Sequence, residues 1–138
     1  MSLSASAVAL LGLVAWTLLL VFLLVNLRGL LVMSGRMAVN AFAADGSNTP
    51  GLGQRLARAH ANCVENVPLF AAALLYAMVT GQTQITDPLA PLLLGARIFQ
   101  SLMHLISTSP LFVWLRFAGF LAQLVILAWW LLRLAGWV

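Results

Sequence analysis

Apolar residues fill four long segments of the chain, and polar residues gather in the connectors between them. The segments run over 4–33, 55–80, 88–107 and 110–133. A helix needs about 20 apolar residues to cross a hydrocarbon core of about 30 Å, so the pattern predicts four transmembrane helices. The first segment lacks the charged start and the small-residue cleavage site of a signal peptide, and we therefore expect it to be retained.

The connectors between the segments predict how the helices are arranged. The clearest linker is 44–54, ADGSNTPGLGQ, which is rich in Gly and Asn and contains an Asp-Gly turn signal. The second connector reads GQTQITDP, and the third, STSP, is very short. Short connectors join antiparallel neighbours. We therefore expect an all-α membrane protein in which residues 1–138 form one domain, a four-helix bundle running up, down, up and down.

Composition agrees with a bilayer environment, because 63% of the residues are apolar, only 7% are charged and the mean hydropathy is +1.04. All seven basic residues are arginine. This usage is typical of anion binding, but a GC-rich genome explains it equally well. The arginines form no basic stripe, so no nucleic-acid partner is expected. The single Cys63 excludes an internal disulfide and an all-cysteine metal site, and no metal is expected.

The distribution of arginines also predicts topology. None of them flanks the second connector, whereas four flank the first: Arg28, Arg36, Arg55 and Arg58. By the positive-inside rule, the first and third connectors face the cytoplasm and both termini face outward. We expect an integral protein of the bacterial inner membrane. An aromatic belt is expected at the outer interface, made of Trp129, Trp130 and Trp137.

Each of the last three segments carries one stripe of polar or small residues at helical spacing. The stripes are Arg58, Asn62 and Glu65; Arg97, Gln100, Ser101 and His104; and Arg116, Gly119, Phe120 and Gln123. With a rise of about 1.5 Å per residue, the three stripes lie at similar depths in the membrane. Because an arginine facing lipid costs about 2.5 to 3.5 kcal/mol, the stripes should face each other or a water-filled cleft.

The charges in these stripes do not balance, because one glutamate faces three or four arginines. Removing an ion from water costs several kcal/mol unless it is paired, so the cleft has capacity for a bound anion. The alternative is that Glu65 pairs with Arg58 or Arg97 to hold the bundle together. The other arginines would then extend to the membrane interface.

The segment 58–70, RAHANCVENVPLF, resembles the second-helix signature of the MAPEG family, the membrane-associated proteins in eicosanoid and glutathione metabolism. That signature has Arg, then Asn four residues on, Glu three further and then Pro. The resemblance extends to SGRMAVNAFA after the first segment, GARIFQSLMH in the third and WLRFAGF at the start of the fourth. It therefore covers nearly the whole chain.

The resemblance implies a homotrimer of four-helix subunits, with glutathione held between subunits on the cytoplasmic side. The residues that would bind its two carboxylates and one ammonium are Arg36, Arg58, Asn62, Glu65, Arg97, Gln100 and His104. Arg116 matches the arginine thought to hold the thiolate in the prostaglandin E and leukotriene synthases, and is the candidate catalytic residue. A guanidinium lowers the pKa of a nearby thiol, and the thiolate is the nucleophile.

We therefore predict a glutathione transferase or peroxidase that acts on lipophilic electrophiles or lipid hydroperoxides from the bilayer. Gln100, His104 and Phe120 replace residues more usual in the family, so we expect glutathione binding to persist even where the chemistry differs. The alternative is a non-catalytic protein that binds or presents a lipid. A small transporter or channel is disfavoured, because the stripes provide no continuous polar path to the outer face.

Overall fold

The structure is a computed structural model that describes residues 2–49 and 51–138, and these residues form helices and loops without a strand. Four long helices correspond to the predicted segments: α1 (Ala5–Met33), α2 (Leu52–Val79), α4 (Ala90–Ile106) and α5 (Pro110–Leu134). The short helix α3 (Thr83–Thr86), in the second connector, was not predicted. Helix α2 also begins earlier than expected, within the predicted linker.

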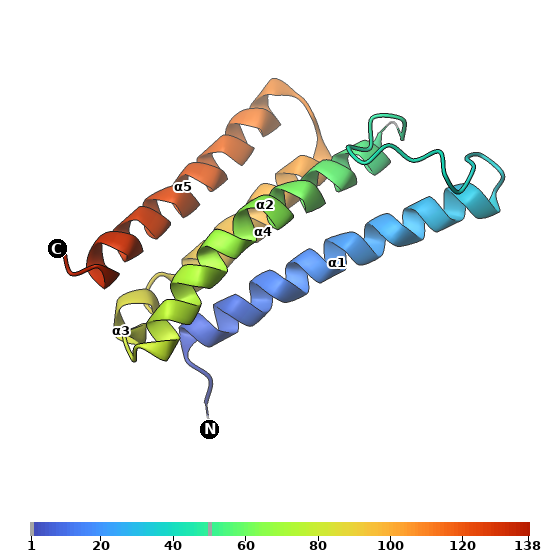
Figure 1. Cartoon of the computed structure of the whole chain (residues 1–138). Coiled ribbons are helices and arrows are strands. Elements are labelled where there is room, and N and C mark those ends of the chain that lie inside the picture. Colours follow the sequence, from blue (N-terminus) through green and yellow to red (C-terminus); the bar gives the residue numbers. More distant parts are fainter. Residues whose placement is uncertain (1, 50) are drawn as a thin grey trace.

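The long helices lie side by side, as Figure 1 shows. The 34–49 segment of the first connector and the 107–109 turn lie at one end of the bundle, and α3 and both termini lie at the other. Helix α5 packs mainly against α4, and α1 packs against α2 and α4. We call the end with the 34–49 segment the connector end and the other the terminal end.

Local sequence signals explain where the helices begin and end. The side chain of Ser4 accepts a hydrogen bond from the backbone N–H of Ala7 at 3.2 Å and caps α1. Gly35, at φ 71°, follows the end of α1 in the left-handed conformation that glycine adopts without strain. The expected Asp-Gly turn forms in the connector. There the Ser47 backbone N–H donates to Asp45 at 3.0 Å and lowers the pKa of that carboxyl from its ordinary value.

The core and the outer surface are both apolar, as expected for a protein dissolved in lipid. A continuous cluster of buried aliphatic and aromatic side chains joins the four long helices. The exposed face of α1 is lined by Val8, Leu11, Leu18, Phe22 and Val25. Helices α1, α2 and α5 are long and apolar enough to cross a membrane, and α4 is a shorter apolar helix. Soluble monomers rarely expose apolar surface on this scale.

The predicted aromatic belt is wrong for one of its members. Trp130 is 0% exposed and packs in the core, whereas Trp129 and Trp137 are exposed. The physical reason is helical phase, because Trp130 lies seven residues after the buried Gln123 and therefore on the same inward face of α5. Only the tryptophans on the outward face are placed to meet headgroups.

A polar contact at the terminal end fixes the start of α1. Asp87, next to α3, accepts hydrogen bonds from the backbone N–H and the hydroxyl of Ser6, at 2.8 and 2.6 Å. The Ser6 hydroxyl also lies 2.6 Å from that of Thr86. A carboxylate at a helix N-terminus satisfies a free N–H and interacts favourably with the helix dipole. Asp87 therefore clamps the first turn of α1 to the second connector.

Replacing Asp87 by alanine is expected to lower the free energy of unfolding by about 2 kcal/mol, because a charge-assisted contact to a helix end is lost. Asp87→Asn keeps an acceptor and should lose less. Denaturation of the purified protein in detergent, followed by tryptophan fluorescence, measures the effect. The matched control is Asp45→Ala, which removes an exposed carboxylate with only a local contact. Equal losses of unfolding free energy in the two alanine variants would contradict the stabilising role assigned to Asp87.

Candidate functional site

Asn62 is the centre of a polar network that joins three helices. Its side-chain oxygen accepts hydrogen bonds from Nη1 of Arg97 at 2.6 Å and from Nε2 of Gln100 at 3.2 Å. Asn62 comes from α2, and both donors come from one face of α4, three residues apart. The predicted convergence of the first and second stripes is therefore present in the structure.

The network continues into α5 through Gln123. Its Nε2 donates to Oε1 of Gln100 at 2.9 Å and to the Gly119 carbonyl at 2.8 Å. A β-carbon on Gly119 would lie 3.2 Å from the ring of Phe99 and 3.4 Å from Cβ of Gln100. Glycine therefore allows α4 and α5 to approach closely at this level, which brings the two glutamines within hydrogen-bonding distance.

Arg97 is completely enclosed by the bundle. It is 0% exposed, and its Nε and Nη2 atoms are buried without a hydrogen-bond partner. Its guanidinium carbon lies 5.3 Å from the centre of the Phe70 ring, a cation–π contact. A buried cation normally requires a counter-charge, whereas the one hydrogen bond made by this guanidinium goes to the neutral Asn62.

A second contact lies closer to the connector end, between α4 and α5. Nη1 of Arg116 lies 3.0 Å from Nδ1 of His104, and both side chains are half-buried. His104 lies in the last turn of α4 and Arg116 lies in the second turn of α5, so the short turn at 107–109 brings them together. The predicted third stripe therefore contacts the second through this pair as well as through Gln123.

The other predicted site residues lie on the outside of the isolated chain. Arg58 and Glu65 are exposed on α2, and Arg36 is exposed just after α1. Glu65 is therefore not the partner of the buried Arg97. The predicted set divides into an inner group, which we call the inner polar network (Asn62, Arg97, Gln100, His104, Arg116 and the additional Gln123), and an outer group (Arg36, Arg58 and Glu65).

The arginines form no ion pair in the part of the chain that the structure describes. Each side-chain hydrogen bond that an arginine donates there goes to a neutral acceptor: Asn62, His104, and the carbonyls of Ala43 and Leu105. The contact to Leu105 comes from Arg55 at 2.8 Å and satisfies a carbonyl in the last turn of α4. The connector end is thus strongly cationic and can attract an anion.

Comparison with known proteins gives one match, to a protein family, over nearly the full length of the chain. The sequence model of the MAPEG family matches residues 6–136. The chain belongs to the MAPEG family. No curated protein and no solved structure matches it. The family includes glutathione-dependent transferases and peroxidases as well as members without catalytic activity, so membership does not by itself select between the two predicted functions.

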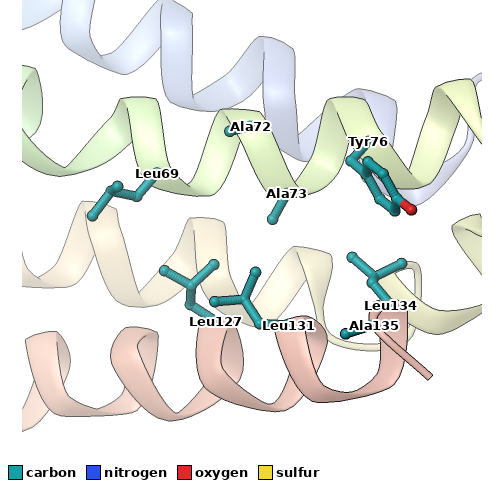
Figure 2. A pocket seen from close by; sticks show the side chains of 8 residues that line it. All are labelled: Leu69, Ala72, Ala73, Tyr76, Leu127, Leu131, Leu134 and Ala135. Carbon is teal, nitrogen blue, oxygen red and sulfur yellow. The ribbon is translucent and has the colours of Figure 1, made fainter. Parts of the chain in front are cut away.

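This MAPEG protein also has an apolar cavity, of about 450 Å³, between α2 and α5. Figure 2 shows its lining, which consists of Leu69, Ala72, Ala73, Tyr76, Leu127, Leu131, Leu134 and Ala135. The Tyr76 hydroxyl is the only polar side-chain group among these eight residues. The cavity lies beyond the inner polar network, toward the terminal end, and suits a hydrocarbon group.

Two residues at the polar network of this MAPEG protein were not among the predicted ligand-binding positions. Gln123 connects α4 to α5, and Phe70 covers the Arg97 guanidinium. The sequence already placed Gln123 in the polar stripe that begins at Arg116, but gave no reason to count it as a ligand-binding residue. Phe70 carries no such signal, since a phenylalanine in an apolar helix is usually a packing residue.

Proposed function

We propose that the protein is a glutathione transferase or peroxidase of the inner bacterial membrane. In this proposal all four long helices cross the bilayer in alternating directions, with the connector end in the cytoplasm and the termini outside. The apolar outer surface and the concentration of arginines at the connector end support this placement. The substrates are glutathione from the cytoplasm and a lipophilic electrophile or hydroperoxide from the bilayer.

The observation that carries the proposal is the uncompensated positive charge of the connector end. The arginines there bond to neutral groups, and two nitrogen atoms of the buried Arg97, Nε and Nη2, have no hydrogen-bond partner. An anion is therefore the expected ligand. Glutathione carries two carboxylates and one ammonium, and a set of several arginines with the single Glu65 complements those charges.

The exposed position of Arg58 and Glu65 supports the predicted homotrimer. They lie on a face of α2 that also exposes Leu69. An arginine facing lipid at this depth costs about 2.5 to 3.5 kcal/mol. In a trimer, a neighbouring copy would cover this face, and the outer group would meet the inner polar network of the next subunit across a shared site.

Within this site we assign two kinds of role. Arg36, Arg58 and Glu65 bind the charged ends of glutathione, and Arg97 and Gln100 hold Asn62 in place to contact it. Arg116 is the catalytic residue, because its guanidinium favours the thiolate over the thiol. In transfer, the thiolate donates an electron pair to the electrophilic carbon, and the leaving group departs with the bond pair. In peroxidase chemistry, two thiols become a disulfide while a hydroperoxide becomes an alcohol and water.

Glutathione binding tests the proposal directly. Titration of the purified protein with glutathione near neutral pH is expected to produce the ultraviolet absorbance of a bound thiolate, because the guanidinium lowers the thiol pKa. S-methylglutathione provides the control, since it has the same charged groups and no ionisable thiol. Absence of saturable binding at millimolar glutathione, for wild-type protein in lipid nanodiscs, would contradict the proposal.

The apolar cavity between α2 and α5 favours a second candidate, a non-catalytic protein that binds a lipid chain. Filling the cavity distinguishes the two. Leu131→Trp should abolish binding of a fluorescent fatty acid in either case. Turnover of a small electrophile such as chlorodinitrobenzene with glutathione should persist in that variant only if the protein is an enzyme. Fatty-acid binding without glutathione turnover in the wild type would favour the second candidate.

A further inference from the structure

The contact between His104 and Arg116 determines the protonation of the histidine. A guanidinium has five N–H donors and no acceptor. At the observed 3.0 Å between Nη1 of Arg116 and Nδ1 of His104, the ring nitrogen must therefore accept. His104 is consequently neutral, with its proton on Nε2. One edge of the arginine is thus held by a neutral acceptor, and its charge is left intact.

We propose that His104 is a positioning residue that orients the Arg116 guanidinium toward the glutathione sulfur. The inference rests on the function proposed above and adds to it a residue that acts through Arg116 without contacting the sulfur. A free arginine side chain has several rotatable bonds and loses rotamer entropy when it is fixed. A hydrogen bond to a rigid helix removes much of that freedom before the substrate arrives.

The surroundings of the pair make this role specific. A carboxylate at position 104 would also hold Arg116, but it would neutralise the charge that stabilises a thiolate. Neutral imidazole avoids that loss. The α4 backbone that carries His104 is itself fixed to α2 and α5 by Gln100, one turn earlier. The orientation of Arg116 is therefore tied to the framework of the inner polar network.

Two substitutions of His104 separate positioning from simple packing. Asparagine places its oxygen near the position of Nδ1 and can still accept from Arg116, whereas leucine fills similar space without an acceptor. His104→Leu is expected to lower kcat/KM for chlorodinitrobenzene about 10-fold near neutral pH and to raise the thiol pKa of bound glutathione by about 1. His104→Asn should stay within about threefold of the wild type in kcat/KM.

A spectroscopic readout completes the test without requiring turnover. Solid-state NMR of the full-length protein in lipid, with ¹⁵N-labelled histidine, should show His104 protonated at Nε2 only, with His60 assigned by a His60→Asn variant. A proton on Nδ1 of His104, or a wild-type thiol pKa in His104→Leu, would overturn the inference while leaving the proposed function intact. Absence of a bound thiolate in the wild type would instead overturn both.

Discussion

Arg116→Ala is expected to reduce glutathione conjugation by about 10- to 100-fold at about pH 6.5, because an adjacent cation lowers a thiol pKa by about 1 to 3. The direction of this pH dependence follows from the ionisation of the glutathione thiol. With Arg116 present, the thiol pKa lies below the free value of about 8.5, so a larger fraction of the thiol is ionised near neutrality. Without it, the thiolate fraction falls at low pH and recovers as pH rises through the free value. The difference between variant and wild type should therefore largely disappear above about pH 9.

The matched control is Arg133→Ala, on the same helix. Arg133 is exposed at the terminal end, and its guanidinium lies 5.7 Å from the Trp129 ring. Its loss removes an equal charge far from the inner polar network and should leave the pH–rate profile unchanged. Rates are measured with chlorodinitrobenzene at saturating glutathione. A constant ratio between Arg116→Ala and the wild type at all pH values would show that Arg116 does not act on thiol ionisation.

Replacing Asn62 by leucine is expected to lower the free energy of unfolding by about 3 kcal/mol, among the largest stability effects in the chain, because it leaves a buried cation without a partner. Arg97 donates its one hydrogen bond to Asn62, and Gln100 donates to the same oxygen. Neither donor is exposed enough to turn to water. Denaturation in mixed detergent micelles, followed by tryptophan fluorescence, measures the loss.

The double variant Asn62→Leu with Arg97→Met supplies the decisive comparison. Removing the cation as well should restore most of the lost stability, because a hydrophobic replacement of a buried charge is often neutral or stabilising. The control is Asn66→Leu, one turn later, where the side chain donates only to the Asn62 carbonyl of its own helix. A double variant as unstable as Asn62→Leu alone would contradict the assigned interaction. The restored protein should still lose glutathione affinity.

Much of the fold could be predicted because helical segments in a membrane are long, apolar and separated by polar connectors. The four long helices begin and end close to the predicted positions. Helix α3 was missed because four residues are too few to show a helical period. The start of α2 was placed too late because Gly53 resembles a linker residue, although it is buried within the first turn.

The site could be predicted only in part. A helical stripe shows which side chains share one face of a helix, but it does not show which neighbouring helix covers that face. The stripes identified Asn62, Arg97 and Gln100 as members of one cluster, which the structure confirms. They could not show that Arg97 is sealed inside while Glu65 lies outside, since that depends on which neighbouring helix covers each face. The contact between His104 and Arg116 likewise depends on the geometry of the 107–109 turn.

The two hydrogen bonds received by the Asn62 side-chain oxygen have a chemical consequence for selectivity. A carbonyl oxygen has two lone pairs, and Arg97 and Gln100 occupy both. A ligand can therefore form a hydrogen bond with the Asn62 side chain only by accepting one from the NH₂ group of Asn62. The Asn62 amide is thus held as a hydrogen-bond donor toward the ligand. It favours carbonyl or carboxylate oxygens and disfavours ammonium groups.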